Sequence, residues 1–264
     1  MRLDEAFAKA RADSRAALVG YLPAGYPTVS GAITALRAMV DAGVDVVEVG
    51  LPYSDPLMDG PVIQRAVDAA LAAGTDTPDV LRTVEAVAAA GVPAVVMSYW
   101  NPLLRYGPER FARDLAGAGG AGVITPDLIP DEADDWLPAA RSVDLDTVFL
   151  VAPSSTEERL ALTTAACRGF VYAASTMGVT GTRDQVSDAA EVLVTRTRAV
   201  TELPIAVGLG VSSGEQAAQL ARFADGVIVG SAFVRRLLDA PDEATGVTGV
   251  GTLTAELADG VRRS

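Results

Sequence analysis

The chain has 264 residues, half of them hydrophobic, and carries a net charge of −13 with an isoelectric point of about 4.4. A chain of this length and composition buries a full hydrophobic core, so we expect one domain over residues 1–264. Nucleic acids and anionic membrane surfaces are bound through basic patches, and the acidic charge therefore argues against both as partners.

Three residue types are absent or nearly absent, and their scarcity narrows the chemistry. The chain has no histidine, which excludes imidazole acid–base catalysis, Ser-His triads and the usual histidine-rich metal sites. Its single cysteine, Cys167, cannot form an intrachain disulfide. The only lysine, Lys9, is far in sequence from any predicted strand end, which argues against a Schiff base. Carboxylates, tyrosines and backbone amides remain as candidate catalytic groups.

The N-terminal residues 1–13 are charged and amphipathic, unlike an apolar leader segment, and they predict a helix at 2–12. No apolar run approaches the ~18 residues that a membrane span needs. We therefore expect a cytoplasmic protein that does not contact the membrane.

Short β-branched runs then alternate with alanine-rich segments whose apolar residues recur at helical spacing. The β-branched runs predict strands at residues 17–21, 45–50, 94–99, 122–125, 147–151, 169–173, 205–208 and 226–230. The alanine-rich segments predict helices at residues 30–42, 61–73, 78–90, 108–118, 131–142, 156–167, 184–202 and 213–223. Residues 239–251 are expected to form a loop before a last helix.

Eight repeats of strand and helix predict an α/β protein with a closed (β/α)8 barrel, the TIM-barrel fold, which holds about 250 residues in one domain. A doubly wound open sheet also alternates strands and helices. It usually has fewer strands, however, and no GxGxxG motif follows the first run here. We expect the helix at 2–12 to plug the bottom of the barrel.

The segment VVEVGLPYSDPLMDGPVIQRA, residues 46–66, places two carboxylates at the ends of one strand-to-helix loop. Glu48 interrupts an apolar β-branched run, so it lies near the strand exit or is buried at a cost of several kcal/mol. Asp59 precedes Pro61, a good first residue for the next helix. Two structural roles stay open: Asp59 as a helix cap, and Glu48 as the partner of an arginine.

In a barrel, function resides where the strands end and the following loops begin. After the sixth predicted strand, ASTMGVTGTR (174–183) is small and glycine-rich, which suits a closing lid. GLGVSSGEQ (208–216) and VGSAFVRR (229–236) follow the seventh and eighth strands. Open backbone N–H groups and the start of a helix near Ser231 predict a phosphate site at these loops.

Five blocks in this order resemble the α-subunit family of tryptophan synthases: YLPAGYP (21–27), EVGLPYSDPLMDGP (48–61), ASTMGVTGTR (174–183), VGLGVSS (207–213) and VGSAFV (229–234). The resemblance implies a (β/α)8 barrel that cleaves indole-3-glycerol phosphate to indole and glyceraldehyde 3-phosphate in a reverse aldol reaction. It implies that indole passes to a β subunit in an α2β2 heterotetramer. No cofactor is implied for this chain, because pyridoxal phosphate belongs to the partner.

Carried over by motif, Glu48 matches the family's general acid and base, and Asp59 matches the acid that holds the indole N–H. Tyr172 matches a tyrosine beneath the lid, and Thr180 matches a lid threonine whose hydroxyl reaches Asp59 on closure. The phosphate ligands that the resemblance implies are Gly181, Gly210, Gly230 and Ser231.

The indole ring also needs an apolar wall, which we expect from Tyr21, Ile63, Tyr172 and Leu209. One departure from the family concerns the lid, where Thr176 stands at a position that carries arginine in some members. This departure puts the stability of lid closure in question.

Three other functions fit parts of the sequence. A different phosphosugar barrel enzyme, such as an epimerase or isomerase, would share the glycine loops, although the lack of histidine argues against metal-dependent epimerases. A flavin-binding barrel would also share them, and a colourless protein would exclude it. A non-catalytic subunit that regulates a partner is the third, and lyase turnover without any partner would reject it.

Overall fold

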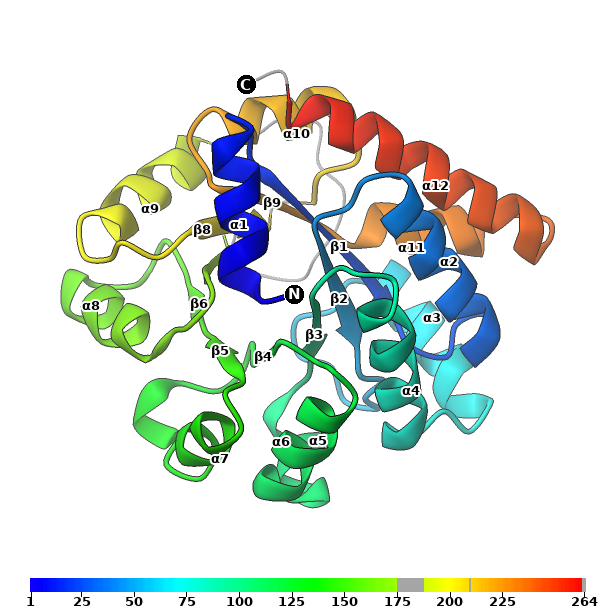
Figure 1. The fold of residues 1–264 in the computed structure, drawn as a ribbon, viewed down its shortest axis with the longest axis horizontal. Helices are drawn as coiled ribbons and strands as arrows, with labels where there is room; N and C mark the ends of the chain where they lie inside the picture. Colours follow the sequence, from blue (N-terminus) through cyan, green and yellow to red (C-terminus); the bar gives the residue numbers. More distant parts are fainter. Residues whose placement is uncertain (175–187, 209, 263–264) are drawn as a thin grey trace.

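The strands form one parallel sheet that curls into a nearly closed barrel, with helices arranged around its outside (Figure 1). The computed structural model describes residues 1–174, 188–208 and 210–262. In these ranges the strand order is β5-β4-β3-β2-β1-β9-β8-β7-β6. The strands are β1 (Ala17–Pro23), β2 (Val46–Gly50), β3 (Ala94–Met97), β4 (Gly122–Ile124), β5 (Asp146–Val148), β6 (Leu150–Val151), β7 (Val171–Ala174), β8 (Ile205–Gly208) and β9 (Gly226–Val229).

The predicted (β/α)8 architecture is confirmed, because all eight predicted strand regions form strands in the expected order. The fifth region is divided at Phe149 into β5 and β6. The Val148 carbonyl accepts a hydrogen bond from Thr125 N at 3.2 Å, on the β4 side. The Phe149 carbonyl accepts one from Tyr172 N at 3.3 Å, on the β7 side. This divided region therefore links the two ends of the sheet.

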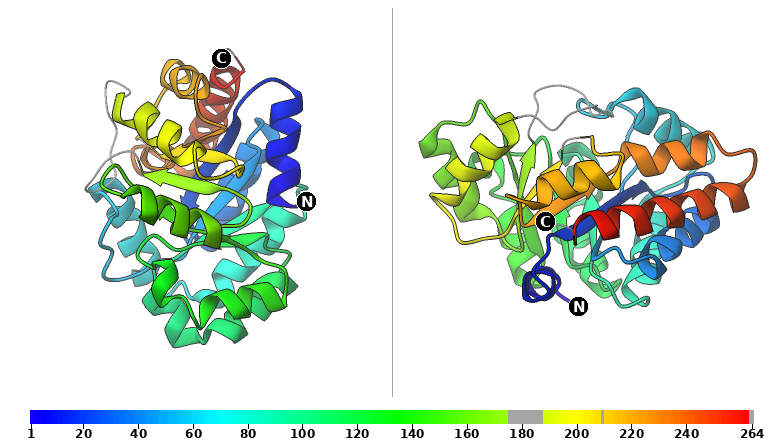
Figure 2. Two further views of the ribbon diagram at one scale, coloured as in Figure 1. Left: turned by 90° about the vertical axis from the view of Figure 1, so that its left-hand side faces the viewer. Right: turned by 90° about the horizontal axis from the view of Figure 1, so that it is seen from above.

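The helices surround the barrel except for α1, which covers one of its ends (Figure 2). They are α1 (Leu3–Ala12), α2 (Val29–Asp41), α3 (Pro61–Ala72), α4 (Thr77–Ala88), α5 (Trp100–Tyr106), α6 (Pro108–Gly117), α7 (Trp136–Ser142), α8 (Glu157–Ala166), α9 (Asp188–Arg198), α10 (Gly214–Ala221), α11 (Ser231–Leu238) and α12 (Glu243–Gly260). The helix expected at 131–142 is divided into a short 3-10 helix, Pro130–Glu132, and α7. Helix α5 was not predicted. None of the helices in the described ranges is long and apolar enough to cross a membrane.

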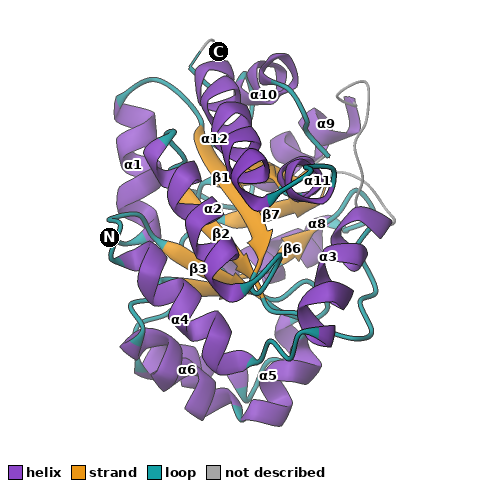
Figure 3. Ribbon diagram, turned by 90° about the vertical axis from the view of Figure 1, so that its right-hand side faces the viewer, coloured by secondary structure: helices purple, strands orange, loops and turns teal. Residues whose placement is uncertain are grey.

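The loop predicted at residues 239–251 is wrong, because α12 already begins at Glu243 and packs beside α2, α10 and α11 (Figure 3). Asp242 caps the helix by accepting a hydrogen bond from Thr245 N at 2.8 Å. Glycine disfavours a helix interior by about 1 kcal/mol, which is why the sequence misleads here. A Cβ added at Gly246 would lie 3.1 Å from Leu237 of α11, so the glycine permits close helix packing. Burial of this helix face outweighs the weak local propensity.

The predicted N-terminal helix plugs the barrel as expected. Its buried residues Leu3, Phe7 and Ala10 belong to a hydrophobic cluster that includes inward residues of the barrel strands. The Phe7 and Phe170 rings lie 5.3 Å apart, and a Cβ added at Gly226, the first residue of β9, would lie 2.9 Å from Phe7. Helix α1 therefore closes the end where the strands begin, and leaves the opposite end for the site.

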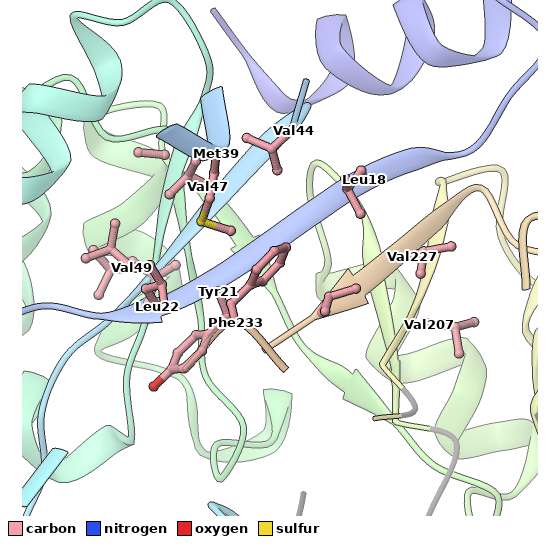
Figure 4. Close-up of a cluster of buried hydrophobic side chains, with 14 of the residues drawn as sticks. Leu18, Tyr21, Leu22, Met39, Val44, Val47, Val49, Val207, Val227 and Phe233 are labelled. Carbon is pink, nitrogen blue, oxygen red and sulfur yellow. The ribbon is translucent and has the colours of Figure 1, made fainter. Parts of the chain in front are cut away.

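A second and larger hydrophobic cluster lies between the sheet and the surrounding helices (Figure 4). Leu18 and Leu22 of β1 belong to it, together with Met39 of α2 and Phe233 of α11. Gly20 lies at the close approach of β1 and α2, because a Cβ there would overlap the Met39 side chain. This packing fixes the strand ends, and with them the loops that carry the candidate site.

Candidate active site

Glu48 is buried inside the barrel, at the third position of β2. Its neighbours Val47 and Val49 pack in the outer cluster, and since successive strand side chains alternate in direction, Glu48 points inward. Tyr21 of β1 is its register partner. Only 2% of Glu48 is exposed. The sequence left open whether Glu48 lies near the strand exit or is buried at a cost in free energy, and the structure shows that it is buried.

The Glu48 carboxyl has an unusual electrostatic environment. Burial, followed by the charge of Asp59, raises its pKa to about 8. Among the described residues, its Oε2 atom has no hydrogen-bond partner, and no arginine contributes to the shift of its pKa. The structural role as an arginine partner is therefore not supported, and the group is protonated at neutral pH.

The raised pKa of Glu48 predicts a pH-dependent difference in stability between the wild type and Glu48→Gln. The unfolded carboxyl titrates near 4.5 and the folded one near 8, so the folded state binds this proton more tightly. Raising the pH from 4.5 to 8 therefore removes stability from the wild type only. We expect the free energy of unfolding of Glu48→Gln to exceed that of the wild type by several kcal/mol above pH 8, and not at pH 4.

Urea unfolding from pH 4 to 9 measures this difference. The exposed substitution Glu85→Gln on α4 is the matched control, because it makes the same chemical change outside the barrel. A stability difference that does not change with pH would contradict a raised pKa for Glu48.

Asp59 lies in the loop between β2 and α3, close enough to Glu48 for its charge to raise the pKa of the Glu48 carboxyl. The Tyr99 hydroxyl donates a hydrogen bond to its Oδ1 at 3.2 Å. Burial raises the pKa of Asp59, while this hydrogen bond lowers it. The N-cap of α3 is Gly60, and no side chain in the described ranges caps that helix. Asp59 is therefore not the helix cap that the sequence left open.

Two tyrosines flank the carboxylates from different strands. Burial and the negative charges of Asp59 and Glu48 raise the pKa of Tyr21 and of Tyr172 well above the usual value. Both hydroxyls therefore stay protonated. A Cβ at Gly50 would overlap the Tyr21 hydroxyl, and one at Gly208 would overlap that of Tyr172. These two glycines make room for the aromatic side chains above the carboxylates.

The structure brings together Tyr21, Glu48, Asp59 and Tyr172, four of the residues that the sequence assigns to one site. Ile63 is 5% exposed in the first turn of α3, within the hydrophobic cluster that includes Tyr21. Tyr99, which contacts Asp59, was not among the predicted site residues. Its position as an aromatic residue at the end of a predicted strand is the only feature of the sequence that points to it. Three predicted site residues lie outside the described residues: Thr180, Gly181 and Leu209.

The start of α11 is an open helix N-terminus near these residues. Gly230 is its N-cap, with no side-chain cap among the residues described. Ser231, the first residue of α11, is 4% exposed, and a Cβ at Gly230 would lie 3.3 Å from the Tyr21 ring. Backbone N–H groups at a helix N-terminus attract anions. The predicted phosphate ligands Gly230 and Ser231 thus lie directly beside the tyrosine that faces Glu48.

The neighbouring helix α10 offers no such opening. Its first residue, Gly214, donates its backbone N–H to Glu256 of α12 at 2.9 Å, and Ser213 caps the helix by accepting from Gln216 N. Gly210 precedes this helix with φ +69, a left-handed backbone that favours glycine. The electrostatics therefore favour the N-terminus of α11 over that of α10 as the anion site.

Comparison with known proteins identifies the family of the chain. The family model described as tryptophan synthase alpha chain matches residues 7–262. The tryptophan synthase alpha chain of Salinispora tropica is 63% identical over 99% of this chain and 98% of that protein. The corresponding chain of Thermobifida fusca is also 63% identical, over 97% of this chain and 96% of its own length.

Solved structures give the same result. A Mycobacterium tuberculosis tryptophan synthase structure superposes with a TM-score of 0.94 at 59% identity, over 99% of this chain and 98% of that chain. Tryptophan synthase subunit alpha from Legionella pneumophila superposes with a TM-score of 0.89 at 32% identity, over 98% of each chain. The chain therefore belongs to the tryptophan synthase alpha chain family.

Proposed function

We propose that Glu48 is the general acid and base of the family's reaction, and that Asp59 is the carboxylate that receives the indole N–H. The chain is a carbon–carbon lyase of tryptophan biosynthesis that cleaves indole-3-glycerol phosphate to indole and glyceraldehyde 3-phosphate, and indole passes to a β subunit. The different environments of the two carboxyls support these roles for Glu48 and Asp59. The carboxyl of Glu48 is buried with a pKa of about 8, beside an Asp59 carboxylate that accepts a hydrogen bond from Tyr99.

The two carboxyls suit the two halves of a reverse aldol cleavage. Protonated Glu48 gives its proton to C3 of the indole, which makes the ring a leaving group. Ionised Asp59 accepts a hydrogen bond from the ring N–H and stabilises the positive charge that develops on the nitrogen. As the carbon–carbon bond breaks, the Glu48 carboxylate takes the proton of the substrate hydroxyl, which becomes the aldehyde. Glu48 ends the cycle protonated, so no external proton is consumed.

The remaining predicted residues bind the substrate in this proposal. Tyr21 and Tyr172 flank the indole ring, and their raised pKa values keep their hydroxyls neutral beside two acids. The rest of the apolar wall is assigned to Ile63 and Leu209, and the lid contact with Asp59 to Thr180. The phosphate lies at the open start of α11, with ligands Gly181, Gly210, Gly230 and Ser231.

Ser231→Ala is expected to weaken the binding of the substrate phosphate. A hydrogen bond to a charged group contributes about 1.5–3 kcal/mol, so the Michaelis constant should rise about tenfold or more, with a smaller change in kcat. Steady-state indole release measures this, with Ser142→Ala as the control, because that hydroxyl donates to the Ala139 carbonyl on α7. An unchanged Michaelis constant for Ser231→Ala would place the phosphate elsewhere.

Membership of the family and an apolar surface on this chain support a β subunit as the partner. Leu57, Leu104 and Ile129 are 75%, 49% and 44% exposed, and they follow the neighbouring strands β2, β3 and β4. Parallel neighbouring strands end at the same edge of the sheet, so the segments that carry these side chains follow the strands at the face of the barrel where the loop with Asp59 lies. We assign this face to the β subunit in an α2β2 heterotetramer.

The proposal also covers cofactors, domain organisation and location. Pyridoxal phosphate is held by the partner, and this chain needs no cofactor. Within residues 1–174, 188–208 and 210–262, no group of three or more acidic or cysteine side chains is placed to hold a metal ion. The chain is one domain and acts in the cytoplasm.

The direct test of this proposal is indole release from indole-3-glycerol phosphate, measured for the chain alone and during titration with a β subunit. We expect slow turnover alone and activation on binding, because docking beside Asp59 favours the closed site. A tenfold activation requires a preference of at least about 1.4 kcal/mol for that state. Absence of turnover in both conditions would reject the roles of Glu48 and Asp59.

A further inference from the structure

Tyr99 holds the loop that carries Asp59 from the end of the next strand. It follows β3 and is 5% exposed. Its hydroxyl donates to Asp59 Oδ1 at 3.2 Å and accepts from the Met58 backbone N–H at 3.0 Å. One hydroxyl thus binds two successive residues of the loop, and does so beside the candidate catalytic carboxylate.

Tyr99 is itself fixed by its surroundings. The Ser98 hydroxyl donates to the Tyr99 carbonyl at 2.8 Å, and Trp100 N donates to Asp127 Oδ1 at 2.9 Å. The Tyr99 ring packs against the Tyr53 ring, with centroids 5.5 Å apart. A side chain anchored in this way presents its hydroxyl at a constant place, which is what a positioning group requires.

Two other hydrogen bonds of this loop, among the described residues, do not involve the Asp59 carboxylate. Gln64 Nε2 donates to the Asp59 carbonyl at 2.6 Å, which restrains the backbone and not the side chain. Asn101 Nδ2 donates to the Tyr53 hydroxyl at 3.0 Å, near the start of the loop. In the ranges that the structure describes, Tyr99 supplies the side-chain hydrogen bond to the Asp59 carboxylate.

We propose that Tyr99 is a positioning residue of the lyase reaction, whose hydroxyl orients the Asp59 carboxylate toward the indole N–H. This inference rests on the role proposed above for Asp59. A carboxylate that balances developing charge acts only when it is already oriented, since reorganisation during the reaction would cost part of its effect. Tyr99 contacts Asp59 and acts through it.

The hydrogen bond from Tyr99 also affects the pKa of Asp59, and with it the pH dependence of the activity. The titratable groups within electrostatic range of Asp59 are Glu48, Tyr21, Tyr99 and Tyr172. Burial raises the pKa of Asp59 and the Tyr99 hydroxyl lowers it. Removal of that hydroxyl therefore raises the pKa of Asp59, so a smaller fraction of it is ionised at acidic pH. Activity that needs ionised Asp59 is then lost at higher pH than in the wild type.

The test is Tyr99→Phe, which keeps the ring and removes the hydroxyl. We expect kcat for indole release to fall about 10- to 100-fold, the effect of one hydrogen bond to a charged group, with a smaller change in the Michaelis constant. The acidic limb of the kcat/KM profile should move to higher pH. The ionisation of the substrate phosphate is common to both enzymes, so the difference between their profiles belongs to the protein.

Tyr106→Phe is the matched control. It removes a tyrosine hydroxyl that donates to a carboxylate, Asp114, at 2.7 Å, but on the outer helices α5 and α6. Its kcat and its acidic limb should equal those of the wild type. A purely structural effect of losing a tyrosine hydroxyl would lower stability in both variants and move the acidic limb in neither.

A double-mutant cycle separates this inference from the role of Asp59. If Tyr99 acts through the Asp59 carboxylate, adding Tyr99→Phe to Asp59→Asn should lower kcat much less than Tyr99→Phe does alone. Additive losses, or a Tyr99→Phe enzyme with wild-type kcat and acidic limb, would overturn the positioning role while Asp59→Asn stays impaired. Wild-type activity of Asp59→Asn would instead reject the proposed role of Asp59 itself.

Discussion

Glu48→Gln is expected to lower kcat for indole release by about 10²–10⁴, the usual contribution of a general acid or base. The amide matches the carboxyl in size but has no proton to give to indole C3, and cannot take one from the substrate hydroxyl. The loss should be seen in kcat, because Glu48 acts on the reacting atoms and does not bind the phosphate. Single-turnover indole release with excess enzyme measures it.

Loss of folding cannot account for that result. Since the buried Glu48 carboxyl has a pKa of about 8, its replacement should leave the protein at least as stable as the wild type at neutral pH. Glu85→Gln, on the surface of α4, should retain full activity. A Glu48→Gln enzyme with more than about a tenth of wild-type turnover would show that another group transfers the protons.

Asp59→Asn is expected to lower kcat by about 10²–10³, the typical loss when one electrostatic partner of a developing charge is removed. Asparagine can still accept a hydrogen bond from Tyr99 and from the indole N–H, so the loop should keep its shape. What is lost is the negative charge opposite the ring nitrogen. The Michaelis constant should therefore change less than kcat.

The pH profile of Asp59→Asn checks the same point independently. The acidic limb of kcat/KM that reports the ionisation of Asp59 should disappear from the variant, apart from the ionisation of the substrate phosphate near pH 6. Retention of the wild-type limb together with wild-type kcat would mean that Asp59 does not need its charge.

Much of the fold could be predicted because its signals are local. Most of the buried parallel strands are short apolar runs rich in β-branched residues, and the predicted strand at 205–208 has the same bounds as β8. The errors in predicting helices and strands arise where tertiary packing, and not local sequence, determines the secondary structure. Helix α12 contains four glycines between residues 246 and 260 and forms because one face packs against α11 and α2. The division of the fifth strand at Phe149 reflects barrel closure, for which the sequence carries no pattern.

The site residues likewise fall into those that local sequence can predict and those that depend on tertiary structure. Glu48 and Asp59 could be predicted because an acid inside an apolar run and an aspartate before a helix-starting proline are visible in the sequence. Tyr99 could not, since its role depends on the register that brings the loop after β2 beside the end of β3. The pKa of Glu48 also depends on burial by residues from several strands. Local sequence contains neither the register nor the burial.

Inside the barrel, burial and the charge of Asp59 raise the pKa of Glu48 to about 8, so that it serves as a protonated acid at neutral pH. The alkaline limb of the pH profile of kcat/KM for indole release tests this most directly, because that limb reports the acid form of the free enzyme. We expect a plateau between the acidic limb and pH 8 and a tenfold loss for each further pH unit above it, with the protein still folded. A constant kcat/KM from pH 7 to about 10 would contradict it.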